Sequence, residues 1–216
     1  YSRKFYEDNG FFLKKGGLEI CRKGDDARWE ELKRKVGSGK AFGTNVRLIS
    51  AAEAKEKFPL LDEESLMGAM WDPDAGLVIP RSQDVVSFAV ESAKDKGALK
   101  TFTDTPAIDF EIENGRVTGV KTDKGFIKAD KVVICSGIWG PLMGKKAGVP
   151  VPLMPLEHPL LFFGPLPEAQ GAEDFLVYPL LRDQGNSAYV RDTGRLHGGM
   201  LEWGFYEDKE PRLVDP

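Results

Sequence analysis

The sequence has little cysteine and histidine, with two of each in 216 residues, and it contains no run of about 18 apolar residues. A helix needs a run of about that length to cross a bilayer, so we expect no transmembrane helix. Cys21 and Cys135 stand far apart, and neither has a second cysteine nearby. We therefore expect reduced, buried and inert thiols, as in the cytoplasm or, in a eukaryote, the mitochondrial matrix.

Metal ligands at familiar spacings are also missing. Two histidines and two distant cysteines are too few for a zinc site. The stretch DPDAG from Asp72 to Gly76 begins like a calcium-binding loop, but its twelfth position is Gln83 instead of glutamate, and a proline lies inside it. We expect a turn there and no metal-dependent chemistry.

A strong excess of charge is absent as well, because 30 Lys and Arg residues face 34 Asp and Glu residues, for a net charge of −4. Without a large basic field, nucleic acid is not an expected partner. The 41% of hydrophobic residues suits an ordinary globular protein. The length lies at the upper end of one domain or the lower end of two.

Hydrophobic spacing predicts a mixture of helices and strands. Helical periodicity marks residues 28–36 and 82–96, and Ser50 with Glu53 forms a capping box for a short helix that ends before Pro59. The remaining extended segments predict strands at 11–13 and 18–21 (joined as a hairpin through Gly16-Gly17), 99–103, 107–112 and 116–122 (joined through Asn114-Gly115), 126–128, 131–135, 160–163, 175–178, 187–191 and 199–206.

The stretch ADKVVICSGIWGP, residues 129–141, changes abruptly from a short apolar strand to small residues. In α/β proteins, ligands bind beyond the carboxyl end of a buried parallel strand, and Ser136-Gly137 lets a ligand approach the backbone there. Trp139 can then cover an apolar face of the ligand. A plain turn after the strand explains Ser-Gly equally well, so spacing alone leaves both interpretations open.

Three segments of the sequence resemble the flavin-dependent amine oxidoreductases related to D-amino-acid oxidase, most closely the dimethylglycine and sarcosine dehydrogenases and oxidases. The phrase GRVTGVKT is common to many flavoproteins. More specific are WxPxxG, which begins at Trp71, CxGxWG, which begins at Cys135, and PLxPLxH, which ends at His158. The matching segments are Arg28–Pro80, Gly115–Pro159 and Tyr178–Asp192.

This resemblance implies an α+β fold in which an antiparallel substrate sheet is inserted into an α/β flavin-binding part. Residues 1–77 and 141–216 then belong to the substrate domain, and residues 78–140 to the FAD-binding domain. The family's N-terminal GxGxxG motif, which holds the pyrophosphate, does not occur in the sequence. The closing C-terminal part, and the early histidine that carries covalent flavin in the dimethylglycine branch, have no match either. We therefore expect an incomplete FAD domain, the central part of a larger flavoprotein, and no stoichiometric FAD on these residues alone.

The resemblance also implies cofactor contacts. Ala107 occupies the position whose backbone meets the adenine. Ser136, Gly137 and Trp139 fall along the cofactor. These assignments favour the ligand interpretation of the stretch at 129–141 over the plain turn.

For the substrate side, His158 in PLEHP and Tyr189 in SAYVRD match family residues that face the amine. Amine oxidation needs a neutral nitrogen, so a nearby proton acceptor is useful. The structural alternatives are that His158 caps a strand end and that Tyr189 packs in a sheet with its hydroxyl in water. Arg182 and Arg191 can bind a substrate carboxylate bidentately, although surface arginines are common.

The leading hypothesis is part of an FAD-dependent oxidoreductase that acts on an N-methylated glycine, dimethylglycine or sarcosine. The alternative is a non-catalytic relative that kept the flavoprotein fold as an assembly or interaction module. The expected partners are a small amine and the remainder of the parent flavoprotein, without nucleic acid or membrane.

Overall fold

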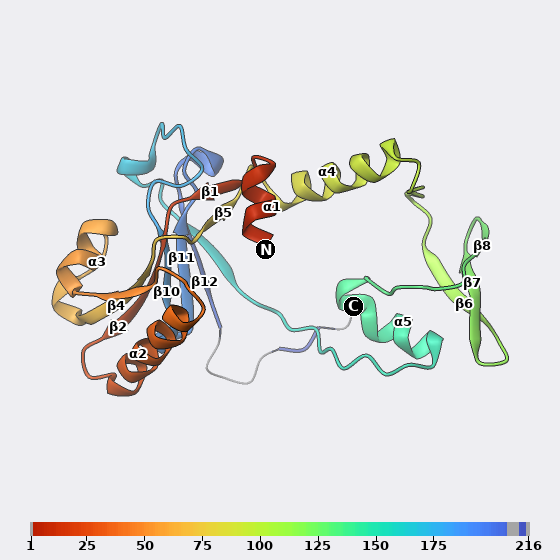
Figure 1. Cartoon of the computed structure of the whole chain (residues 1–216), viewed down its shortest axis with the longest axis horizontal. Coiled ribbons are helices and arrows are strands. Elements are labelled where there is room, and N and C mark those ends of the chain that lie inside the picture. The colour runs from red at the N-terminus through yellow and green to blue at the C-terminus, as the bar shows by residue number, and fades with distance from the viewer. Residues whose placement is uncertain (1, 207–211, 215–216) are drawn as a thin grey trace. The chain divides into compact units, whose positions relative to one another are not determined.

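The computed structural model describes residues 2–206 and 212–214, and the chain divides into two compact units. Unit 1 contains residues up to 90 together with those from 158 to 209, and unit 2 contains residues 91–157 and 210–216. Figure 1 labels most of the helices and strands of both units. Each unit has its own sheet, and the assignment of these parts to a substrate side and a cofactor side stays a prediction.

Unit 1 is built on a seven-stranded mixed sheet with the order β3-β4-β2-β10-β11-β12-β9. Neighbouring strands run antiparallel except β2 and β10, which are parallel. A separate two-stranded sheet pairs β1 with β5. The strands are β1 (Phe12–Lys14), β2 (Gly17–Arg22), β3 (Arg47–Ile49), β4 (Leu66–Asp72), β5 (Gly76–Val78), β9 (Leu160–Phe163), β10 (Leu180–Asp183), β11 (Ala188–Asp192) and β12 (Leu201–Phe205).

Two helices of unit 1, α2 and α3, begin at residues whose side chains cap them. Asp25 accepts a hydrogen bond from Arg28 N at 3.0 Å, and the predicted capping box of Ser50 and Glu53 is confirmed, with hydrogen bonds of 3.1 and 3.2 Å. The α-helices are α1 (Ser2–Asp8), α2 (Asp26–Ala41), α3 (Ala51–Lys57) and α4 (Ser82–Asp95), of which α4 continues past residue 90 into unit 2. The 3₁₀ turns are η1 (Glu63–Ser65), η3 (Pro167–Ala169), η4 (Gln184–Asn186) and η5 (Leu196–Gly198).

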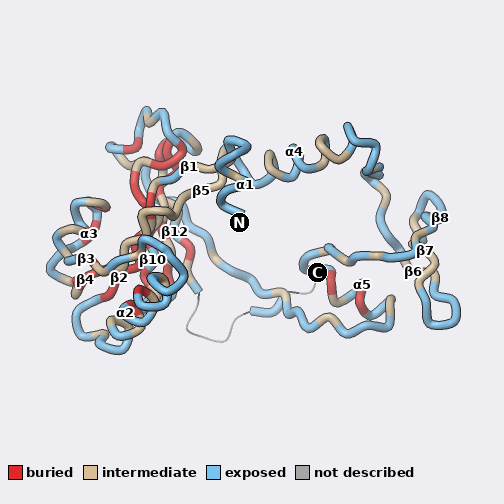
Figure 2. The backbone as a smooth tube through the Cα atoms, in the orientation of Figure 1, coloured by how far each residue is buried: buried red, intermediate tan, exposed pale blue. Residues whose placement is uncertain are grey.

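The core of unit 1 lies on one face of the large sheet, where α3 and the chain after it cover the strands (Figure 2). Successive strand residues alternate between faces, so Ala69 enters this core while Gly68 faces α2 on the other side. A Cβ at Gly68 would lie 2.8 Å from the Trp29 ring, which explains the glycine there. The core side chains are Leu18, Ile20, Ile49, Ala54, Phe58, Leu61, Leu66, Ala69, Tyr178, Leu181 and Val190.

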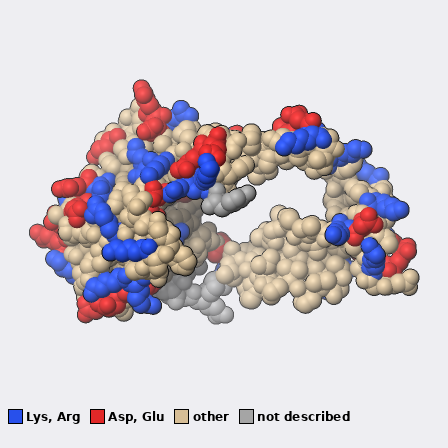
Figure 3. All heavy atoms as spheres, in the orientation of Figure 1, with Lys and Arg blue, Asp and Glu red and all other residues tan. Residues whose placement is uncertain are grey.

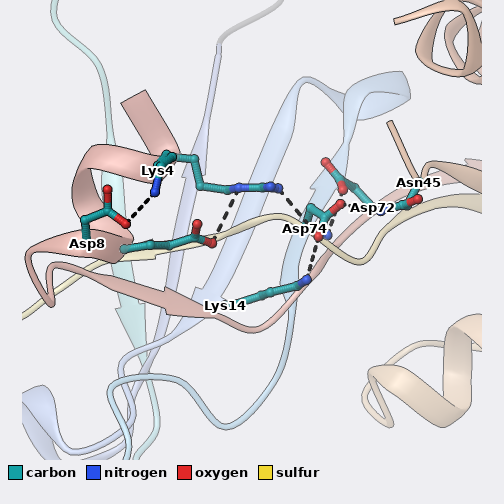
Figure 4. Close-up of polar contacts among 8 residues, drawn as sticks. Lys4, Asp8, Lys14, Asn45, Asp72 and Asp74 are labelled. Carbon is teal, nitrogen blue, oxygen red and sulfur yellow. Dashed lines mark hydrogen bonds and ion pairs between the residues drawn. The ribbon is translucent and has the colours of Figure 1, made fainter. Parts of the chain in front are cut away.

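Asp74 ties the N-terminal segments of unit 1 together (Figure 4). Its carboxylate accepts hydrogen bonds from Lys14 Nζ at 2.5 Å and Asn45 Nδ2 at 2.8 Å, and Arg3 Nη1 lies 3.5 Å away. These hydrogen bonds lower the pKa of Asp74, and the one from Lys14 has the largest effect. Asp72 Oδ1 accepts from Asp74 N at 2.9 Å, so the predicted turn at this stretch is confirmed.

Unit 2 combines a three-stranded antiparallel sheet, in the order β6-β7-β8, with one short helix. The predicted hairpin at Asn114-Gly115 is confirmed, and both residues have positive φ, 52° and 77°, as a tight turn of this kind requires. A Cβ at Gly144 would lie 2.5 Å from Val151 Cγ2, so that glycine lets the helix pack closely on the chain after it. The elements are β6 (Ala107–Glu113), β7 (Arg116–Thr122), β8 (Gly125–Lys128), η2 (Gly137–Trp139) and α5 (Gly140–Ala147).

Charged side chains of both signs are interspersed over unit 1, as the balanced composition suggests (Figure 3). In the same view, the part of unit 2 around α5 shows almost only uncharged atoms. Large exposed apolar side chains in that part are Leu142, Val149, Leu153, Met154 and Leu156. Unit 2 therefore leaves apolar surface uncovered within the described part of the chain.

Some predicted strands are wrong, and the reason is pairing. Segments 11–13 and 18–21 are both extended, but they do not form a hairpin, because β1 pairs with β5 while β2 pairs with β4 and β10. Segments 99–103 and 131–135 find no neighbouring strand among the described residues. In the predicted strand 175–178, the Asp192 carboxylate takes the N–H groups of Val177 and Tyr178 instead. The other predicted strands and the helix at 82–96 are confirmed within a few residues.

Candidate substrate and cofactor sites

His158 and Tyr189 lie together at one end of the large sheet in unit 1. In the sheet register, Tyr189 of β11 faces Gly204 of β12, and Gly204 faces Leu160 of β9. His158 precedes Leu160 by two residues, so the register carries it to Tyr189. The His158 Nε2 and Tyr189 Oη atoms are 3.1 Å apart, which is hydrogen-bonding distance.

The absence of a side chain at Gly204 leaves the space that the Tyr189 ring needs for this contact. A Cβ at Gly204 would lie 2.0 Å from Tyr189 Cζ and 2.2 Å from Tyr189 Oη. The tyrosine ring therefore lies across the strand beside it, over the position where any other residue would place a side chain. As a result, the hydroxyl reaches toward His158 along the sheet surface.

Burial raises the pKa of Tyr189, and the nearby Tyr206 and Glu202 raise it further. The hydroxyl is therefore protonated at neutral pH and can donate a hydrogen bond. Donation to Nε2 requires the tautomer in which the other ring nitrogen, Nδ1, carries the hydrogen. The pair can then act as a donor and an acceptor that face each other.

Tyr206 is a third aromatic residue of this cluster, and the sequence analysis did not single it out. Its ring stacks on His158 with centroids 4.4 Å apart and an interplanar angle of 27°. Strand periodicity could have found it, because residues two apart on a strand share a face and Tyr206 follows Gly204 by two. The predicted strand at 199–206 already included both positions.

A pocket of about 220 Å³ opens beside the cluster. Tyr189 and Tyr206 contribute two phenol rings to its wall, and Arg182, which faces Tyr189 directly across β10 and β11, contributes a guanidinium group. The remaining lining comes from Gln184, Ser187 and Ala188. The pocket thus combines aromatic surface with a cation, an arrangement that suits a small zwitterion.

Arg191 lies on the same strand as Tyr189 but is engaged differently. Its Nη2 donates to Glu202 Oε2 at 2.5 Å, and neither side chain is fully exposed. The structure therefore places Arg182 at the pocket and Arg191 in an ion pair. His197, for which the sequence offered no role, lies 5.8 Å from the Phe162 ring, centroid to centroid.

The residues expected along the cofactor lie in unit 2. Ala107 and Ser136 line a common, mostly apolar pocket of about 320 Å³ together with Phe110, Val120, Val132, Val133, Ile134, Cys135 and Met143. Ser136 Oγ is buried and has no hydrogen-bond partner among the described residues. An unpaired buried hydroxyl is costly, and a bound ligand could satisfy it.

Gly137 and Trp139 follow this pocket in the turn η2. Gly137 has φ of +54°, and a Cβ there would meet no atom within 4 Å. Trp139 is 54% exposed, so its indole is free to cover a bound group. The apolar wall, the unpaired hydroxyl and the open backbone fit a flat, partly polar cofactor such as FAD. These residues do not supply the pyrophosphate contacts of a GxGxxG loop.

Across residues 2–206 and 212–214, no group of three or more side chains is placed to bind a metal ion. In the same part of the chain, no helix is both long and apolar enough to cross a membrane.

Residues 2–215 match the family model described as FAD dependent oxidoreductase. The chain belongs to this family, and the resemblance seen in the sequence is confirmed. Human mitochondrial sarcosine dehydrogenase is 31% identical over 95% of this chain and 22% of its own length. The mitochondrial regulatory subunit of pyruvate dehydrogenase phosphatase from mouse is 29% identical over 100% of this chain and 24% of its own length.

Among solved structures, L-proline dehydrogenase from P. horikoshii superposes with a TM-score of 0.78 at 32% identity, covering 93% of this chain and 51% of that one. The chain therefore spans about a quarter of these curated relatives and about half of this solved structure. The expected α+β flavoenzyme fold is confirmed.

Proposed function

We propose that this chain forms part of an FAD-dependent amine oxidoreductase that oxidises an N-methylated glycine, either sarcosine or dimethylglycine. The observation that carries the proposal is the contact of 3.1 Å between His158 and Tyr189 at the edge of a pocket that also contains Arg182. Family membership and the relative named sarcosine dehydrogenase support the substrate class. When bound, FAD supplies the acceptor for a hydride from the carbon next to the nitrogen.

The residues of the pocket have complementary roles in this proposal. Arg182 binds the substrate carboxylate, and the rings of Tyr189 and Tyr206 face the methylated nitrogen. The ammonium form must lose a proton before oxidation. Tyr189 Oη takes that proton while its own hydroxyl proton moves to His158 Nε2, so the imidazole ends up protonated. Arg191 stays with Glu202 and supports the strand instead of the substrate.

On the cofactor side, Ala107, Ser136, Gly137 and Trp139 contact FAD. The unpaired Ser136 hydroxyl supports this assignment, because a ligand atom would satisfy it. We also propose that residues 78–140 serve the cofactor and the rest of the chain the substrate. The proposed compartment is the cytoplasm or, in a eukaryote, the mitochondrial matrix, and two relatives that are named as mitochondrial support the second.

The test is His158→Ala in the complete polypeptide. We expect its rate of flavin reduction by saturating sarcosine or dimethylglycine, measured anaerobically by stopped flow, to fall roughly 10²- to 10⁴-fold, the range for a positioned acid or base. Tyr189→Phe removes only a hydroxyl and should lower the same rate without releasing FAD. Reduction of the His158→Ala flavin at the parent rate would refute the catalytic assignment.

A second candidate is a non-catalytic assembly or interaction module, and one observation favours it. A relative that matches the whole chain is named as a regulatory subunit of pyruvate dehydrogenase phosphatase. The two candidates differ in a simple test on the complete polypeptide. A yellow protein that sarcosine or dimethylglycine bleaches without oxygen supports the enzyme, and a colourless protein supports the module.

A further inference from the structure

The imidazole of His158 is exposed, yet it is held from two directions. Tyr189 Oη lies 3.1 Å from Nε2, within hydrogen-bonding distance, and the Tyr206 ring stacks on the imidazole with the two centroids 4.4 Å apart. The hydrogen bond alone would let the ring rotate about the N···O line. The stack removes that rotation, because two rings at an angle of 27° share a face.

Tyr206 can serve as a fixed platform because its own backbone is anchored. Its N–H donates to Ser187 O at 2.8 Å, and Ser187 precedes β11, the strand that carries Tyr189. Tyr189 and Tyr206 therefore move with the same pair of strands, β11 and β12. A shift of one backbone segment relative to the other would require the strands themselves to slide.

The side chain of Tyr206 is more exposed than a packing role would require, at 64%. An aromatic residue that only stabilised the sheet would bury its ring. Instead, the ring stacks on the imidazole and also forms part of the pocket wall. Once the imidazole has gained a proton, the ring face stabilises the positive charge.

We propose that Tyr206 is a positioning residue for the reaction: its ring fixes the plane of His158 so that Nε2 points at Tyr189 Oη. This inference rests on the proposed amine oxidation. It predicts that the ring matters and the Tyr206 hydroxyl does not. The matched variants are Tyr206→Phe, which keeps the stack, and Tyr206→Leu, which keeps an apolar side chain but loses the ring.

The first test is independent of flavin and of activity. The chain has two histidines, so the ring protons of His158 can be assigned in an NMR spectrum with the help of His197→Gln. We expect a large upfield ring-current shift of the His158 ring protons in the parent chain and in Tyr206→Phe. In Tyr206→Leu only the more distant Tyr189 ring remains, with its centroid 6.0 Å from that of His158, so most of the shift should be lost. Absence of the shift in the parent chain, or its persistence at full size in Tyr206→Leu, would overturn the inference.

The second test is kinetic and uses the complete polypeptide. Misplacing a catalytic group slightly can cost up to about 10²-fold in rate, so Tyr206→Leu should lower the limiting rate of flavin reduction at saturating amine by roughly 10- to 100-fold, in addition to any change in KM from the altered pocket wall. Tyr206→Phe should recover most of that loss. A raised KM with an unchanged limiting rate would make Tyr206 a pocket wall only and overturn the inference.

The two tests separate this inference from the proposed function. Suppose that the NMR shift behaves as expected but no amine reduces the flavin of the parent polypeptide. The proposed function and the catalytic role of Tyr206 are then both refuted, while the stacking of Tyr206 on His158 is confirmed. If the amine reduces the flavin and Tyr206→Leu reacts at the parent rate, only the role of Tyr206 fails.

Discussion

Asp192 is a fully buried carboxylate that fixes the backbone at the end of β11, the strand that carries Tyr189. It accepts hydrogen bonds from Val177 N at 2.8 Å, Tyr178 N at 2.8 Å and Gly194 N at 2.9 Å. Charge-assisted bonds of this kind are the stronger ones in proteins. One side chain thus replaces the strand pairing that 175–178 would otherwise need.

Replacing this residue tests how much the arrangement contributes. Asp192→Ala leaves buried N–H groups without partners, and each such group costs about 1–3 kcal/mol. We expect the free energy of unfolding, measured with urea, to fall by about 3–5 kcal/mol. Glu173→Ala, at an exposed position just before the stretch 175–178, is the control and should change the free energy of unfolding by less than about 0.5 kcal/mol. A similarly small effect of Asp192→Ala would contradict this account.

The elements around the candidate site depend on close approach between β11 and β12. Gly204→Ala places a methyl group where the Tyr189 ring lies, so the ring must move. We expect a loss of about 1–3 kcal/mol in unfolding free energy, as for other overpacked sites, together with slower flavin reduction in the complete polypeptide.

Gly37→Ala in α2 is the matched control for this substitution. A Cβ at Gly37 meets no atom within 4 Å, so the change should stabilise the helix by about 0.5–1 kcal/mol. Urea unfolding of both variants provides the comparison. Equal effects of the two substitutions would show that Gly204 has no special contact with Tyr189.

The sequence predicted correctly the elements that depend on interactions between residues close in sequence. The capping box at Ser50 and the Asn114-Gly115 turn depend on residues close in sequence, and both are confirmed. Pairing of distant strands was not readable, which is why the hairpin at 11–21 was wrong. The segment 131–135 has the apolar character of a buried strand, but Val133 is 82% exposed because no described strand lies beside it.

The candidate site shows the same division. His158 and Tyr189 could be named through family motifs, although their contact depends on the register of β9, β12 and β11. Tyr206 lies in no quoted motif, and only the strand pairing reveals its neighbours. The ion pair of Arg191 with Glu202 is likewise a cross-strand contact that could not be predicted from the sequence.

At the scale of the whole molecule, the chain lacks the loop that would hold the FAD pyrophosphate. We expect the purified chain of 216 residues to carry no stoichiometric FAD, because the contacts around Ala107 and Ser136 serve only part of the cofactor. Absorbance at about 450 nm, where flavins absorb, measures this directly. A stoichiometric flavin band after desalting would show that the remaining contacts suffice.

In the large sheet of unit 1, the parallel pair of β2 and β10 brings together two segments that are far apart in the sequence. Arg22 and Asp183, which donate and accept across this junction, are 161 positions apart. During synthesis, the first strands therefore leave the ribosome long before the strands that complete their sheet. Contacts so distant in sequence slow folding, because the intervening chain must be closed into a loop first. Strands β2, β3 and β4 can pair with one another early, but the edge of β2 that faces β10 has no partner until residues 180–183 have been made, and an open strand edge of this kind favours aggregation.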